Sequence, residues 1–289
     1  MINLHLLYNK TYYSHLQQAD FEESLTGYNK QIFNATFDHK RDYTPSPVAT
    51  DTLILETLYP GLMVGNGNPH GGNLAENDIK NGFTFDYVTG QPIIPASTVK
   101  GILRTAFTSY PQVVSEFLQV MGRADVTDIA ALDTEIFKGG DIFLDAVVYD
   151  GDIRGHVMGS DAMAPHTKEY ESAAAYILLK VLPGVRFEFR FILSDGVLSA
   201  KEKKDLFSRL IRLFGVGSRT NVGFGKFKEG TSAIAERKMA KTAAAGDDKV
   251  VCPHCGAENY RFYQDQVTFR KRCFKCKEFL YSKEEWEEL

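Results

Sequence analysis

The sequence predicts an α+β fold followed by a small metal-binding segment. Short apolar runs with strand character alternate along the chain with segments of helical periodicity. Residues 185–191 alternate between apolar and charged side chains, which is typical of a strand. All four cysteines lie between residues 252 and 276, which indicates a compact metal site. A length of 289 residues is enough for one large domain or two.

The composition is that of an ordinary globular protein, with 44% hydrophobic and 24% charged residues. The formal net charge is −4, so any nucleic-acid contact must come from a local patch or from one shared with other subunits. Residues 1–5 lack the charged region and apolar core of a signal peptide, and no apolar run approaches the length that spans a bilayer. We therefore expect a cytoplasmic protein with no membrane partner.

The first part of the chain is predicted to hold helices and then strands. Residues 1–47 form an N-terminal helical segment, because apolar side chains recur three, four and seven positions apart until Pro45 and Pro47 interrupt the pattern. Residues 52–59 are predicted as a buried strand, and the alternation in residues 83–87 predicts an exposed one.

Residues 95–107 are predicted to form an amphipathic helix with Ser97 as its N-cap. One face carries apolar side chains, namely Val99, Ile102, Leu103, Ala106 and Phe107. Lys100 and Arg104 share the other face, which by spacing alone is typical of a solvated surface. Gly101 costs the helix roughly 1 kcal/mol relative to alanine, which close approach to a neighbouring backbone would offset.

The middle of the chain continues the same alternation. Residues 111–138 have helical periodicity, and residues 141–149 form a strand that is apolar on both faces, which predicts a central position in a sheet. Residues 150–170 are predicted as a loop. Residues 175–182 and 185–191 are predicted as two further strands.

Residues 199–214 form a well-marked helix that begins at Ser199, with Glu202 completing a capping box. A glycine-rich stretch follows, and residues 223–228 are predicted as the last strand. The order strand, helix, strand, strand, helix, strand, with insertions, is that of a ferredoxin-like unit over residues 48–230.

The glycine-rich stretch, Gly215–Phe227, is a candidate anion-binding loop. Glycines allow tight turns that aim bare backbone amides at a ligand, and the Arg219 guanidinium suits phosphate. The candidate contacts are Gly217, Ser218, Arg219, Thr220, Asn221 and Gly223. The stretch matches neither common nucleotide-loop pattern. The alternative is a glycine-rich hairpin turn with no ligand.

Four cysteines in two Cys-x-x-Cys pairs predict a zinc ribbon over residues 250–289, after a linker over residues 231–249. The ligands are Cys252, Cys255, Cys273 and Cys276. Four thiolates close the coordination sphere of Zn²⁺, so we expect a structural metal, with His254 surplus to the ligand set.

Cations and aromatic residues interleave in the spacer between the cysteine pairs. Arg270, Lys271 and Arg272 follow Phe262 and Phe269, a pattern that suits base stacking beside phosphate contacts. The alternative is a small basic ribbon whose aromatic side chains form its core.

Three segments resemble a known family when they are taken together. Residues 90–104 resemble the G-x-P-x-I-P-x-S-S-x-K-G-x-x-R signature of the RAMP superfamily of CRISPR proteins. Residues 215–227 resemble the C-terminal glycine-rich loop of that superfamily, and residues 161–166 resemble a motif of the terminal backbone subunit of the type III-B (Cmr) effector complex. The resemblance covers residues 48–230.

This resemblance implies a ferredoxin-like (RRM-like) fold and RNA binding in a multi-subunit ribonucleoprotein. It implies RNA contacts from Ser97, Thr98, Lys100 and Arg104 as well as from the glycine-rich loop. The implied role is non-catalytic, in a subunit that caps the complex near the 3′ end of the guide RNA in antiviral defence. The implied partners are guide RNA, target RNA, other RAMP backbone subunits and a small helical subunit. The zinc ribbon is not a standard part of that subunit.

Two other functions remain open from the residues. One is a RAMP-type endoribonuclease that processes guide precursor RNA, with His70, His156 and His166 as candidate acid–base groups. The other is a scaffold subunit that makes protein contacts only.

Overall fold

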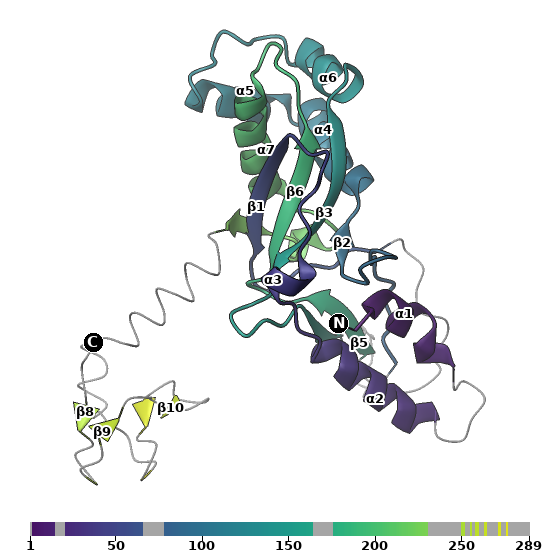
Figure 1. Ribbon diagram of the computed structural model, residues 1–289. Coiled ribbons are helices and arrows are strands. Elements are labelled where there is room, and N and C mark those ends of the chain that lie inside the picture. The colour runs from purple at the N-terminus through teal and green to yellow at the C-terminus, as the bar shows by residue number, and fades with distance from the viewer. Residues whose placement is uncertain are drawn as a thin grey trace, which may run out of the picture. The chain divides into compact units, whose positions relative to one another are not determined.

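The computed structural model describes residues 2–14, 21–65, 78–163 and 176–230. Further along the chain it describes residues 250–251, 255, 258–259, 263–264, 271–272 and 276. The chain divides into two compact units, Met1–Thr231 and Ser232–Leu289 (Figure 1). In the described part of the chain, no helix combines the length and hydropathy that crossing a bilayer requires.

A five-stranded antiparallel sheet forms the centre of the first unit. In order across the sheet, its strands are β2 (Ile93–Ile94), β3 (Ile142–Asp150), β6 (Arg186–Ile192), β1 (Asp51–Thr57) and β7 (Phe227–Glu229). β6 is antiparallel to both β1 and β3, so those two strands run parallel to each other.

Two helices, α4 (Ala96–Ser109) and α7 (Ala200–Phe214), connect these strands and lie behind the sheet in Figure 1. The chain order β1, α4, β3, β6, α7, β7 is that of the ferredoxin-like unit. The predicted α+β class and the order of its elements are therefore confirmed. The predicted capping box of Ser199 and Glu202 also begins α7.

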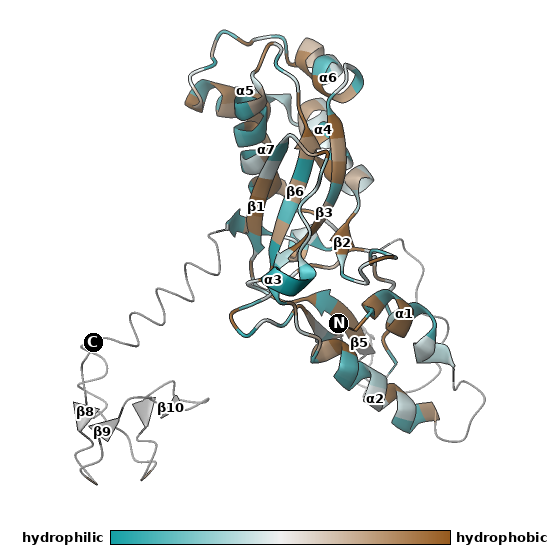
Figure 2. Ribbon diagram, viewed as in Figure 1, coloured by the Kyte–Doolittle hydropathy of each residue, from teal (hydrophilic) through white to brown (hydrophobic). Residues whose placement is uncertain are grey.

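The core lies between the sheet and these two helices. Phe187, Phe189 and Phe191 of β6 are fully buried, and Phe191 meets Phe143 of β3 and Phe207 of α7 at ring distances of 5.8 and 5.5 Å. Figure 2 shows the alternation along β6, whereas β3 is mostly hydrophobic. The alternation in residues 185–191 therefore predicted correctly that the phenylalanine side chains of β6 share one buried face.

Two insertion helices, α5 (Pro111–Val120) and α6 (Ile129–Lys138), follow α4 and pack on α7 and α4. They confirm the helical periodicity predicted for residues 111–138, with a break over residues 121–128.

A second, two-stranded sheet lies beside the N-terminal helices. β4 (Met158–Met163) pairs with β5 (Tyr176–Val181), and α2 (Phe21–Phe33) packs against β4. The prediction of a loop over residues 150–170 is therefore wrong for residues 158–163. Met158–Met163 contains Gly159, Ser160 and Asp161, residues that give no strand signal, and β5 supplies the pairing.

The N-terminal segment is tied to the rest of the unit by buried tyrosines. Tyr8, in α1 (Leu4–Asn9), donates its hydroxyl to the Asn81 carbonyl. Tyr12, in the short helix η1 (Thr11–Tyr13), accepts from the Ile79 amide at 3.1 Å. Both tyrosine side chains are fully buried, so this segment shares the core of the first unit.

Three local predictions need correction. Residues 83–87 form no regular strand; only Phe85 makes an isolated bridge, and the rings of Phe83 and Phe85 are buried rather than exposed. The predicted last strand begins later than expected: residues 223–225 form a turn, and β7 begins at Phe227. Ser97 is not the N-cap of α4; the cap is Pro95, and the Ala96 amide donates instead to Asp145 of β3 at 2.7 Å.

In the second unit the structure describes two short antiparallel pairs. β8 (Val250–Val251) pairs with β9 (Glu258–Asn259), and β10 (Tyr263–Gln264) pairs with β11 (Lys271–Arg272). The linker predicted over residues 231–249 lies outside the described residues.

Candidate nucleic-acid interface

The glycine-rich loop after α7 is fastened to the chain that follows β1. Its two ends meet where the Val216 amide donates to the Gly225 carbonyl at 2.9 Å. The Gly225 amide donates to Gly61 at 2.8 Å, and the Ser218 amide donates to Met63 at 2.9 Å. The loop is therefore held by backbone hydrogen bonds on both sides.

Glycine is required at particular points of this loop. Gly225 has a φ of +67°, and a Cβ atom there would lie 1.8 Å from the Val216 carbonyl oxygen. Gly217 has a φ of +90°, and its Cβ atom would lie 2.3 Å from the Met63 oxygen. Arg219 is the one non-glycine residue of the described chain with a positive φ, at 59°. The glycines thus allow close backbone approach and leave Arg219 in the left-handed region.

The outer side of the loop offers backbone donors. Between Arg219 and Gly223 lies the short helix η2 (Thr220–Val222). The amides of Gly217, Thr220 and Asn221 have no acceptor among the described residues, and Gly217, Ser218 and Asn221 are exposed. Exposed amides beside a half-buried arginine form a surface suited to an anion. The arrangement fits the predicted anion-binding loop.

The predicted contacts on α4 form a second group with different neighbours. The Lys100 ammonium lies 5.8 Å from the centre of the Phe143 ring, and Arg104 lies 3.7 Å from Asp133 of α6. Gly101 is exposed with open space around it, so no described backbone approaches it as predicted. Exposed ion pairs of this kind contribute little to stability, which leaves Arg104 available to another anion.

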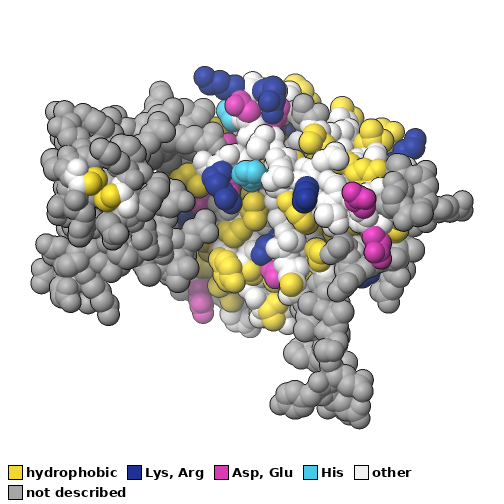
Figure 3. Space-filling model, turned by 90° about the horizontal axis from the view of Figure 1, so that it is seen from below, with side chains coloured by type: hydrophobic (Ala, Val, Ile, Leu, Met, Phe, Trp, Pro, Cys, Tyr) yellow, Lys and Arg dark blue, Asp and Glu magenta, His cyan; other side chains and the backbone are white. Residues whose placement is uncertain are grey.

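The structure therefore brings the predicted residues together in two clusters. The six loop residues share one segment packed on Gly61 and Met63. The other four lie on α4, where Ser97 and Arg104 are exposed and Thr98 and Lys100 are half-buried. Figure 3 shows one face of the molecule, on which Lys and Arg side chains lie interspersed with acidic and apolar ones. That mixture agrees with the net charge of −4.

The sheet face opposite α4 and α7 carries paired charges rather than aromatic rings. Glu56 of β1 contacts Arg186 of β6 and Lys228 of β7, each at 2.9 Å. On the same face, Glu188 accepts from Tyr43 at 2.7 Å. RRM domains stack RNA bases on aromatic residues of this face. Within the described residues, β1, β6 and β7 present charged side chains at this point and no such ring.

The segment before β1, which includes α3 (His39–Asp42), covers part of this face. The rings of His39, Tyr43 and Tyr149 pack on one another with centres 4.5–5.0 Å apart. Burial, together with the hydrogen bond to Glu188, raises the pKa of Tyr43 to about 12. These aromatic rings are engaged with each other and do not form an open stacking surface.

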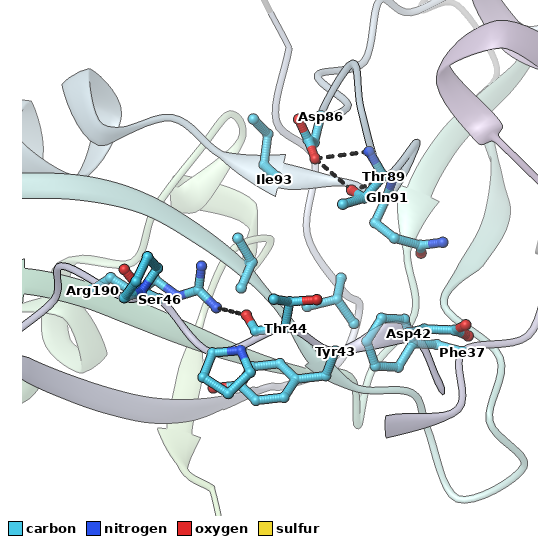
Figure 4. A pocket seen from close by; sticks show the side chains of 14 residues that line it. Phe37, Asp42, Tyr43, Thr44, Ser46, Asp86, Thr89, Gln91, Ile93 and Arg190 are labelled. Atoms are coloured by element: carbon cyan, nitrogen blue, oxygen red, sulfur yellow. Dashed lines mark hydrogen bonds between the residues drawn. The ribbon is translucent and has the colours of Figure 1, made fainter. Parts of the chain in front are cut away.

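A pocket of about 240 Å³ remains beside this segment (Figure 4). Arg190, whose guanidinium donates to the Thr44 carbonyl at 2.7 Å, lies on one side. Asp86, Thr89 and Gln91 lie across from it. Burial opposes the ionisation of Asp86, but hydrogen bonds from Thr89 and Val88 outweigh it and hold its pKa below the usual value. No sequence motif predicts this pocket, because its walls come from segments that are distant along the chain.

Of the three candidate catalytic histidines, the structure describes His156, which belongs to neither cluster. His156 is half-buried, with its Nδ1 atom 3.3 Å from the Phe33 carbonyl, where it joins the N-terminal segment to the turn before β4. His70 and His166 lie outside the described residues.

The predicted zinc ligands belong to the second unit. Cys255 follows β8 and Cys276 follows β11, each in a turn, whereas Cys252 and Cys273 lie outside the described residues. The described residues hold no group of three or more His, Cys, Asp or Glu side chains that could bind a metal. The four-thiolate donor set suits Zn²⁺, and the zinc site stays a prediction. Of the three basic residues in the spacer, Lys271 and Arg272 form β11, and Arg270 lies outside the described residues.

We expect the purified full chain to carry about one zinc ion, because two Cys-x-x-Cys pairs supply a complete tetrahedral set. Replacing Cys252 and Cys273 with serine should remove the metal, as measured by elemental analysis. His254→Ala is the control and should retain it. A zinc content unaffected by the cysteine replacements would contradict the predicted ligand set.

Comparison with known proteins identifies the class. The model of the RAMP superfamily matches residues 54–228. The chain therefore belongs to the RAMP superfamily, as the signature and the glycine-rich loop predicted.

Two solved structures resemble the chain. One is the cryo-EM structure of the type III-B Cmr-beta bound to cognate target RNA, with 21% identity, a TM-score of 0.49, and coverage of 74% of this chain and 75% of that one. The other is the crystal structure of Cmr6 from Pyrococcus furiosus, with 22% identity, a TM-score of 0.40, and coverage of 62% and 97%. No curated protein matches.

Proposed function

We propose that the chain is a non-catalytic RNA-binding backbone subunit of a type III-B CRISPR RNA-guided effector complex. The observation that carries this proposal is the glycine-rich loop of a RAMP-superfamily fold, whose exposed amides lie beside Arg219 on a firmly held backbone. In the proposed role, the loop binds guide RNA through its phosphates. The subunit serves in antiviral defence.

Phosphate contacts of this kind place an RNA strand without reading its bases. Backbone amides and a guanidinium recognise the phosphate group, which every nucleotide carries. This suits a guide RNA whose sequence varies. Lys100 and Arg104 on α4 are proposed as a second set of phosphate contacts, beside the open surface at Gly101.

The resemblance of residues 161–166 to a motif of the terminal backbone subunit supports a position at the end of the complex, near the 3′ end of the guide RNA. Its proposed neighbours are target RNA, other RAMP backbone subunits and a small helical subunit. Asp161 lies in β4, where it pairs with Lys180 of β5 at 2.9 Å. Residues 164–166 lie outside the described residues.

Replacing Arg219 with alanine should weaken binding of guide RNA by roughly tenfold, because a charge-assisted contact to phosphate is lost. The slope of log affinity against log salt should fall by about 0.7, the value for one phosphate on a single strand. The measurement is fluorescence anisotropy with the full chain at several salt concentrations. Arg154→Ala is the matched control, since Arg154 is an exposed arginine that contacts Asp152 on a different turn.

Two results would contradict the proposal. One is unchanged affinity and salt slope when Arg219 and Lys100 are both replaced by alanine. The other is cleavage of repeat RNA by the isolated chain without metal, lost in His166→Ala, which would favour the endoribonuclease.

A further inference from the structure

Tyr59 is an aromatic residue whose side chain is almost fully exposed to solvent. It is 84% exposed, the highest fraction among the large apolar side chains of the described residues. It lies in a tight turn after β1, closed by a hydrogen bond of 2.8 Å from the Gly61 amide to the Leu58 carbonyl. The ring is therefore accessible to a ligand, and the groups around it decide which ligand it suits.

This turn is bonded directly to the glycine-rich loop. The Leu58 amide donates to the Lys226 carbonyl at 2.9 Å, and the Gly61 carbonyl accepts from Gly225 at 2.8 Å. Between these bonds, the Pro60 ring lies 3.5 Å from the position that a Cβ atom on Gly223 would take. Tyr59 is therefore carried on the same backbone framework as the loop donors.

The surroundings of Tyr59 combine apolar and donor groups. Gly223 directly follows η2. Within η2, Val222 is 61% exposed and Asn221 is also exposed. The amides of Thr220 and Asn221, which have no acceptor among the described residues, thus lie two to three residues from Gly223, the glycine beside the Pro60 ring. An aromatic face beside backbone donors matches single-stranded nucleic acid, which presents a flat base and a phosphate in each nucleotide.

We propose that the Tyr59 ring stacks on a base of a single-stranded RNA whose phosphate is bound by the glycine-rich loop. The inference rests on the proposed function, because it assumes that the loop binds RNA. Every base has a π face, so this contact adds affinity without demanding a sequence. It also replaces the stacking surface that the charged and covered sheet face does not offer.

Tyr87 provides a matched control. It is 78% exposed on the turn before β2, and its ring contacts His5 at 5.0 Å rather than the glycine-rich loop. The two tyrosines are therefore alike in chemistry and exposure and differ in their neighbours.

The test measures binding of a fluorescein-labelled single-stranded RNA of mixed sequence to the full chain. Tyr59→Ala should weaken binding by about 5- to 100-fold, whereas Tyr59→Phe and Tyr87→Ala should leave it near the wild-type value. Because stacking releases no counterions, the salt slope of Tyr59→Ala should equal that of the wild type. Thermal unfolding should be unchanged, since the side chain is exposed.

The outcomes separate this inference from the proposed function. If Arg219→Ala weakens binding and Tyr59→Ala does not, the stacking inference is wrong and the proposed function stands. If neither variant weakens binding, both are wrong. If Tyr59→Ala abolishes association with other subunits while RNA affinity of the chain is unchanged, the turn is a protein interface and the inference is overturned.

Discussion

Replacing Lys203 with alanine is expected to lower the free energy of unfolding by about 3–5 kcal/mol. Lys203 is only 1% exposed, and its Nζ atom lies 2.8 Å from a carboxylate oxygen of Asp141 and 2.9 Å from the Ser194 carbonyl. Asp141 is buried as well. Removing the ammonium group would leave that carboxylate in the interior without its cation, and an uncompensated buried charge is strongly unfavourable.

The measurement is urea unfolding of the full chain. Lys201→Ala is the control, because Lys201 belongs to the same helix and is exposed. The double variant Lys203→Met, Asp141→Leu should recover part of the loss, since both charges are then absent. A loss below about 1 kcal/mol for Lys203→Ala, the level of an exposed ion pair, would contradict a buried pair.

The burial of Lys203 could not be predicted from the sequence. The pattern of α7 places Leu206 and Phe207 on its buried face, and position 203 belongs to that same face by helical spacing. A lysine is ordinarily interpreted as exposed, so periodicity alone does not reveal the pairing. The partner, Asp141, directly precedes β3, and only the tertiary fold brings the two residues together.

The order of the main elements followed from the sequence because each has a local signal. The alternation in β6 and the capping box of α7 depend on neighbouring residues only. β4 depends instead on pairing with β5, and the covered sheet face depends on Tyr43 reaching Glu188. Contacts between distant segments leave no trace in local periodicity.

The candidate site also has one part that the sequence predicts and one part that only the fold reveals. Glycine spacing and Arg219 indicated an anion-binding loop, because those residue types have a local conformational meaning. The turn at Tyr59 that supports the loop lies far away in the chain, and its hydrogen bonds to the loop are made through the backbone. Exposed aromatic residues could not be recognised before the fold was known.

Gly225→Ala should reduce guide RNA affinity more than Arg219→Ala does, because it displaces the whole set of donors. The added Cβ atom would lie 1.8 Å from the Val216 oxygen, so the bond between Val216 and Gly225 must break or shift. The adjacent bond to Gly61 would be strained with it. Strain at a positive φ costs about 1–3 kcal/mol, and each lost hydrogen bond about 0.5–1.5 kcal/mol.

Gly122→Ala is the control, because it introduces the strain of an alanine at a positive φ without a steric clash with another backbone segment. Gly122 also has a positive φ, +79°, but no atom lies within 4 Å of its Cβ position. This control should lose about 1 kcal/mol of stability and bind RNA normally. RNA affinity measured by anisotropy, together with urea unfolding, distinguishes the two variants. Both substitutions place an alanine at a positive φ, but only Gly225→Ala disrupts the hydrogen bond to Gly61. Equal RNA affinity of the two variants would therefore mean that the hydrogen bonds that hold the loop do not contribute to RNA binding.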